Sequence, residues 1–119
     1  NFANGDMVGH TAIKDAIVLA MEALDEVLGE VVCAAIGKDV STLITADHGN
    51  ADEINNPITG KPNTQHSLNP VPCIVVDNNR TWEIVNHSGG LSNIAPTLLT
   101  LMDIEKPKEM TASSLIKKS

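Results

Sequence analysis

Aromatic side chains are nearly absent from this chain of 119 residues, which has one Phe, one Trp and no Tyr. A hydrophobic core must therefore be aliphatic, built from Ile, Val, Leu, Met and Ala. Proteins that bind single-stranded nucleic acid stack the bases on aromatic rings. The composition argues against that class.

Basic residues are also scarce, since 8 Lys and Arg stand against 15 Asp and Glu, for a formal net charge of −7. Nucleic acid and anionic membrane surfaces both attract basic patches, so we expect neither as a partner. A chain this acidic that handled phosphate would need positive charge from a bound metal or from elsewhere.

Long apolar runs are absent and cysteines are few. No apolar run approaches the roughly 20 residues that a membrane span needs, and we expect a soluble, cytoplasmic protein. Cys33 and Cys73 both lie in apolar stretches, which favours two buried thiols in a reducing compartment. A disulfide between them has no support in the sequence.

Hydrophobic periodicity predicts two helices. Apolar residues recur at spacings of three and four over residues 12–36, and Asn93 is a good N-cap for a second helix that ends at Leu101 or Met102. The segments expected to form strands, the first two of them buried, are residues 41–46, 71–76 and 81–85. The segments expected to form loops or turns are residues 1–11, 47–70 and 77–80, followed by a polar tail over 103–119 with an apolar anchor at Leu115 and Ile116. A helix followed by a buried strand is half of a βαβ unit, which predicts an α/β fold.

Asp and His side chains recur at positions that favour a metal site. Asp47 and His48 directly follow the predicted strand 41–46, and ligands gather at the carboxyl ends of strands in α/β sheets. Asp6 and His10 are four apart, which puts them on one side of a helical turn. His66, in the long loop, could supply a further ligand. Five ligands of mixed Asp and His type suit Mn²⁺ or Zn²⁺ better than Ca²⁺, and two ions roughly 3.5–4 Å apart are the usual device for phosphoryl chemistry.

Each element also has a simpler interpretation. The spacing of Asp6 and His10 arises often by chance, and Asp47–Gly49 could be an ordinary turn in which Gly supplies a positive φ. His66 alone would be a surface residue of a loop, and we expect His87 to be one. No P-loop, dinucleotide fingerprint or nucleophile elbow is present.

Several strings of this chain resemble the cofactor-independent phosphoglycerate mutase family of the alkaline phosphatase superfamily. The strings are Asn4–Thr11, Glu22–Gly29, Thr45–Asp52, His66–Pro72, Ile94–Leu99 and Lys106–Thr111. They cover nearly the whole chain in order. The resemblance implies part of a doubly wound, mostly parallel sheet with flanking helices, in which residues 1–119 are an incomplete, C-terminal portion of a metal-binding, phosphatase-like domain.

The same resemblance implies a glycolytic isomerase that interconverts 3-phosphoglycerate and 2-phosphoglycerate through a phosphoserine intermediate on a two-metal site. By motif, Asp6, His10 and His66 would bind one ion, and Asp47 and His48 would help to bind the other. The expected metal is Mn²⁺, two ions per complete enzyme, with Zn²⁺, Co²⁺ and Mg²⁺ as alternatives.

The chain departs from that family in lacking several of its parts. The nucleophilic serine, a further Asp ligand and the basic residues that hold the substrate are expected upstream, so we expect this chain alone to be inactive and to self-associate through exposed sheet edges and apolar patches. A smaller departure is Ala12, where the family usually has Gly. A phosphopentomutase, a metal-dependent phosphatase and a non-catalytic complementing fragment are the alternative interpretations.

Overall fold

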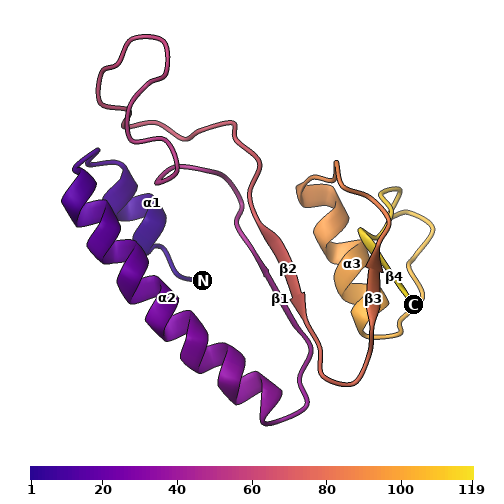
Figure 1. The fold of residues 1–119 in the computed structure, drawn as a ribbon. Coiled ribbons are helices and arrows are strands. Elements are labelled where there is room, and N and C mark those ends of the chain that lie inside the picture. The colour runs from indigo at the N-terminus through magenta and orange to yellow at the C-terminus, as the bar shows by residue number, and fades with distance from the viewer. The chain divides into compact units, whose positions relative to one another are not determined.

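The computed structural model describes all residues from Asn1 to Ser119 (Figure 1). Its elements are α1 Asn4–Gly9, α2 Lys14–Ile36, β1 Thr42–Thr45, β2 Cys73–Val76, β3 Trp82–Ile84, a 3₁₀ turn at Leu91–Asn93, α3 Ile94–Leu101 and β4 Ile116–Lys118. The chain divides into two compact units. The first comprises residues 1–34 and 44–73, and the second comprises residues 35–43 and 74–119. None of the helices combines the length and the apolar character that crossing a bilayer requires.

The first eleven residues are not the loop that their Gly and Asn content predicts, because α1 forms within them. The amide of Met7 donates to the carbonyl of Ala3 at 2.8 Å, and the amide of His10 donates to that of Asp6 at 3.2 Å. So short a helix is not stable alone, and α1 lies beside α2. A Cβ built on Gly5 would lie 3.5 Å from the sulfur of Met21. Packing against α2 therefore overrides the local preference for a loop.

The turn between α1 and α2 depends on one strained residue. Ala12 has a φ of +50°, in the left-handed region where a Cβ costs about 1–2 kcal/mol. The family that the sequence resembles usually has Gly at this position. The backbone conformation supplies the physical reason for that preference.

Replacing Ala12 with Gly should raise the free energy of unfolding by about 0.5–1 kcal/mol, the relief of strain less the entropic cost of Gly. Urea unfolding followed by circular dichroism measures this. The matched control is Ala23→Gly in the exposed interior of α2, which should lower stability by about 1 kcal/mol. Equal losses in the two variants would contradict the assignment of strain to Ala12.

The predicted strands form, but in two small sheets. β1 and β2 are neighbours in one two-stranded sheet, and β3 and β4 form another. β3 and β4 are antiparallel, with Trp82 opposite Lys118 and Ile84 opposite Ile116. β4 was not among the predicted strands, because its Lys-rich residues are typical of a polar tail. The α/β class is confirmed, whereas the doubly wound, mostly parallel sheet stays a prediction.

The expected burial of several apolar segments is wrong. β1 is half-buried with Thr45 exposed, the first two residues of β2 are exposed, and both cysteines are free and exposed. In α2 only Ile17 is buried, and apolar residues such as Val27 and Val31 remain over 40% exposed. A two-stranded sheet has too few neighbouring strands to cover these apolar side chains.

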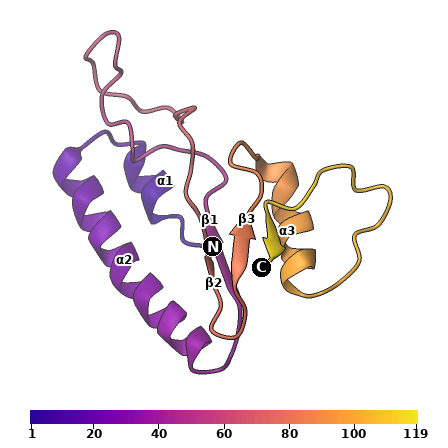
Figure 2. The ribbon, with the colours of Figure 1, turned by 45° about the vertical axis from the view of Figure 1, so that its right-hand side comes forward.

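The second unit has a small core that includes the predicted anchor. Leu101, Leu115 and Ile116 are buried together, and α3 lies against the β3–β4 pair (Figure 2). Thr97 is also fully buried. Its hydroxyl donates to the carbonyl of Asn93 at 2.7 Å and accepts the amide of Leu115 at 2.9 Å. The tail is thereby fixed to α3 by both packing and a buried hydrogen bond.

Asn93 precedes α3 as predicted, but it acts differently from an N-cap. Its side chain caps no amide of α3. The Oδ1 atom accepts the amide of Gly90 at 2.9 Å, and Nδ2 donates to the carbonyl of Ser113 at 2.8 Å. An Asp at this position could accept the amide of Gly90 but could not donate to Ser113. The side-chain amide of Asn93 makes both contacts and so links the start of α3 to the tail.

A buried carboxylate organises the predicted turn at residues 77–80. Asp77, with a side chain 3% exposed, accepts bonds from Trp82 Nε1 at 2.9 Å, Ser41 Oγ at 2.9 Å and Arg80 Nε at 3.1 Å. The Trp82 bond, together with backbone donors and the Arg80 charge, holds the pKa of Asp77 well below its usual value. Arg80 also donates to the carbonyl of Leu101 at 2.6 Å. This carboxylate therefore joins the turn to β3 and, through Arg80, to α3.

Asp77→Asn should lower the stability of the second unit at neutral pH. Because the pKa is depressed in the folded state, the contribution of Asp77 is present above its unfolded value of about 3.9 and is lost as pH falls. The difference from the wild type should therefore shrink between about pH 5 and pH 2. Urea unfolding followed by the fluorescence of Trp82, the single Trp, measures it.

The control is Asp103→Asn, since Asp103 pairs with the same Arg80 at 2.8 Å but is 67% exposed. Exposed ion pairs contribute little, so this variant should stay close to the wild type. A pH-independent deficit in Asp77→Asn would show that lost packing, not the charge, is responsible.

Candidate metal site

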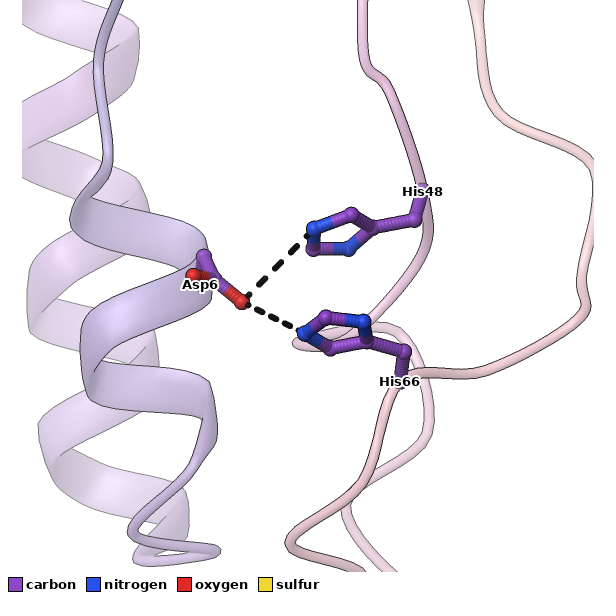
Figure 3. Close-up of side chains that lie close together, drawn as sticks. All are labelled: Asp6, His48 and His66. Atoms are coloured by element: carbon purple, nitrogen blue, oxygen red, sulfur yellow. Dashed lines mark ion pairs between the residues drawn. The ribbon is translucent and has the colours of Figure 1, made fainter.

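Three segments of the first unit bring acid and imidazole side chains together. Asp6 lies on α1, His48 follows β1, and His66 comes from the long loop (Figure 3). Their ligand atoms, one oxygen and two ring nitrogens, all lie within 4.8 Å of one another. The loop at residues 47–70 was predicted, and its length allows His66 to return to the strand end where His48 lies.

One oxygen atom is the centre of this cluster. Asp6 Oδ1 lies 3.1 Å from Nε2 of His66, 3.2 Å from Nε2 of His10 and 3.9 Å from Nε2 of His48. The rings of His48 and His66 are stacked, with centroids 3.7 Å apart and planes 14° from parallel. Three imidazoles therefore face one carboxylate oxygen through the same type of ring atom.

His10 is oriented by a second contact on the far side of its ring. Its Nδ1 lies 2.7 Å from the carbonyl oxygen of Thr64. That oxygen only accepts, so Nδ1 carries a proton and Nε2 is the atom available to a ligand. Imidazoles that bind metals are commonly fixed by such a bond to a carbonyl. No sequence spacing identified Thr64.

Asp47 lies at the edge of the cluster. Its side chain is 75% exposed, and its Oδ1 lies 3.7 Å from Nε2 of His48. His48 thus lies between the carboxylates of Asp47 and Asp6. The structure groups His48 with Asp6 and His66, whereas the resemblance assigned it to a second ion with Asp47. His87 is exposed, as predicted for a surface residue.

The donor set fits a divalent cation. A carboxylate oxygen and an imidazole nitrogen at 3.1 Å both carry lone pairs, so a proton or a cation must lie between them. Mixed oxygen and nitrogen donors suit Mn²⁺ and Zn²⁺. The roles of Asp6, His10, Asp47, His48 and His66 as ligands stay a prediction.

Asn50 holds the central carboxylate in place. Its Nδ2 donates to Asp6 Oδ1 at 3.0 Å and to the Asp6 carbonyl at 3.4 Å. This hydrogen bond lowers the pKa of Asp6, and the charges of His10, His48 and His66 act in the same direction. Asn50 is 6% exposed, and its Oδ1 is buried without a hydrogen-bond donor. Sequence reasoning missed this residue, because an Asn after Asp-His-Gly reads as part of a turn.

The buried amide of Asn50 fits only because residue 9 is Gly. A Cβ on Gly9 would lie 2.2 Å from Asn50 Oδ1. Gly9→Ala should therefore displace Asn50, lower the free energy of unfolding by about 1–3 kcal/mol and raise the pKa of Asp6 toward its ordinary value. Denaturant unfolding and NMR titration of the carboxyl carbon measure the two effects.

Gly29→Ala is the matched control, because no atom lies within 4 Å of a Cβ at this position of α2. It should stabilise the chain by about 0.5–1 kcal/mol through helix propensity. If Gly9→Ala were as stabilising as Gly29→Ala, the close approach of α1 to Asn50 would be disproved.

Comparison with known proteins places this site in a family context. The family model described as the metalloenzyme superfamily matches residues 1–106. The chain is 50% identical over 116 residues to the 2,3-bisphosphoglycerate-independent phosphoglycerate mutase of Symbiobacterium thermophilum, covering 98% of this chain and 22% of that protein. It is 51% identical over 116 residues to the protein of the same name from Vesicomyosocius okutanii, covering 98% of this chain and 23% of that protein.

A solved structure is also similar. A crystal structure of Leishmania mexicana phosphoglycerate mutase at low cobalt concentration superposes with a TM-score of 0.87 and 32% identity, covering all of this chain and 24% of that one. The chain thus spans about a quarter of the length of the relatives that it matches.

Proposed function

The chain belongs to the metalloenzyme superfamily, and we propose that it is the C-terminal portion of the metal-binding domain of a cofactor-independent phosphoglycerate mutase. The single observation that carries this proposal is the convergence of Asp6, His48 and His66 at one point. Identity near 50% to mutases over nearly the whole chain supports the choice of this enzyme. The coverage of about a quarter of those relatives supports a portion rather than a whole enzyme.

Family membership indicates that the site binds a divalent metal, and we propose that Asp6, His10 and His66 hold one Mn²⁺ while Asp47 and His48 contribute to a second. Zn²⁺, Co²⁺ and Mg²⁺ are the alternatives. A bound divalent ion would neutralise phosphoryl oxygens and lower the pKa of a nucleophilic hydroxyl. The low content of Lys and Arg in this chain is consistent with a site whose positive charge comes from metal.

The chain's own residues supply position and charge. Asn50 fixes Asp6, and the carbonyl of Thr64 fixes the ring of His10. In the proposed glycolytic, cytoplasmic enzyme, a serine outside this chain accepts the phosphoryl group of 3-phosphoglycerate and returns it to the other hydroxyl of the glycerate. Without that serine and the basic residues that hold the substrate, residues 1–119 bind metal but do not catalyse the reaction.

Another metalloenzyme of the same superfamily, such as a phosphopentomutase or a phosphatase, is the second candidate. The Asp47–Gly49 string alone fits it equally well. The match to mutases covers 98% of the chain, which includes helix α2 and the segment 66–72, and this coverage favours the mutase.

Asp6→Asn tests the metal site, because it removes the charge on which three rings converge. We expect the chain to bind Mn²⁺ in isothermal titration calorimetry and this variant to bind it more than about tenfold more weakly. Asp15→Asn, which removes the same charge from the exposed first turn of α2, should bind within about twofold of the wild type. Equal weakening in both variants would mean that net charge, not the site, attracts the ion.

The isolated chain with Mn²⁺ should show no turnover of 3-phosphoglycerate in an assay coupled to enolase. Turnover near that of a complete mutase would refute the assignment of the nucleophile to a residue outside this chain.

A further inference from the structure

Beside the cluster lies a further carboxylate, that of Asp52, which forms no ion pair with the histidines. Asp52 Oδ2 accepts the hydroxyl of Ser67 at 2.8 Å and the side-chain amide of Asn69 at 2.6 Å. Partial burial raises the pKa of Asp52, but the bonds from Asn69 and Ser67 outweigh that effect and lower it. The carboxylate is therefore ionised and attached to the chain that follows His66.

Ser67 is attached in turn to the chain that follows His48. Its amide donates to the carbonyl of Gly49 at 2.9 Å, in an isolated antiparallel bridge between residues 49 and 67. Ser67 is 6% exposed, so its bonds are largely protected from water. The bridge joins the residues that directly follow His48 and His66, the two histidines whose rings are stacked.

The packing at Gly49 shows how close this contact is. A Cβ on Gly49 would lie 2.2 Å from Ser67 Oγ and 2.7 Å from Asp52 Oδ1. Only Gly at position 49 lets the hydroxyl and the carboxylate meet there. The Gly of the Asp-His-Gly string thus has a steric role.

We propose that Asp52 is a positioning residue, which through Ser67 and Asn69 closes the loop 47–70 so that His48 and His66 present their Nε2 atoms to the metal site around Asp6. This inference rests on the proposed function. Loop closure has an entropic cost that any ligand must otherwise meet on binding. Bonds that close the loop in advance transfer that cost to folding and raise metal affinity.

Asp52→Asn tests the role of the carboxylate. The substituted amide cannot accept both donors at one oxygen with the strength of an ionised carboxylate. We expect the Kd for Mn²⁺ to rise roughly tenfold. This is the low end of the range for residues that orient metal ligands, because Asp52 is partly solvated and acts through Ser67 and Asn69. Titration with Mn²⁺ alone, followed by the electron paramagnetic resonance signal of the free ion, measures it.

Glu53→Gln is the matched control. It removes one negative charge from the adjacent residue, whose carboxylate accepts Asn63 at 3.1 Å and approaches Asn69 only at 3.5 Å. We expect its Mn²⁺ affinity to stay within about twofold of the wild type. If Glu53→Gln weakens binding as much as Asp52→Asn, or if Asp52→Asn binds as the wild type does, the proposal is wrong.

Ser67→Ala provides a second route, since it deletes the buried donor and keeps the Asp52 charge. If both variants act by breaking the bond between Ser67 and Asp52, the double variant should bind Mn²⁺ no more weakly than the weaker-binding single variant. Full additivity of the two effects would contradict action through this bond.

The metal-free chain supplies a readout that is independent of the ion. Nuclear Overhauser contacts between the rings of His48 and His66 should be present in the wild type and in Glu53→Gln, and weaker in Asp52→Asn and Ser67→Ala. A wild type that binds no Mn²⁺ would overturn the proposed metal site. The contacts between the two rings would then decide alone whether Asp52 closes the loop. Unchanged ring contacts in Asp52→Asn would show that Asp52 does not have this role.

Discussion

The approach of three imidazole rings to the carboxylate of Asp6 is the constraint on which the first unit depends. Such an arrangement puts three ring nitrogens within 4 Å of one carboxylate oxygen, and the lone pairs of nitrogen and oxygen repel unless positive charge lies between them. Asn50 donates to the same oxygen, and the close approach of Gly9 leaves room for that amide. The segment α1 is thus a support for one carboxylate, and its packing against α2 fixes where that carboxylate lies.

The second unit follows the same principle without any link to metal. Asp77 accepts bonds from the turn, from Ser41 and from Trp82, and Arg80 carries the connection to α3. In both units a carboxylate, not a large apolar core, joins segments that are distant in the sequence. That arrangement suits a chain with few aromatic residues and with many apolar side chains still exposed.

Much of this fold could be predicted from local patterns. The periodicity over residues 12–36 predicted α2, and the Asp-His-Gly string after an apolar run located His48 at the end of β1. The pairings that involve distant residues could not be read in advance. The bond from His10 to Thr64 and the bridge between Gly49 and Ser67 depend on how the long loop folds back. The predicted burial of both cysteines was wrong because an apolar sequence shows which side chains favour burial but not whether a neighbour exists to cover them.

The central claim is that His10 and His66, from different segments, share one cation with Asp6. Long-range ¹H–¹⁵N correlation spectra of the four imidazoles during titration with Zn²⁺, a diamagnetic probe, test it most directly. The account predicts that the Nε2 resonances of His10 and His66 shift together and saturate at one equivalent, while those of His87 stay unchanged. Shifts of similar size at all four histidines, or of His10 without His66, would contradict it.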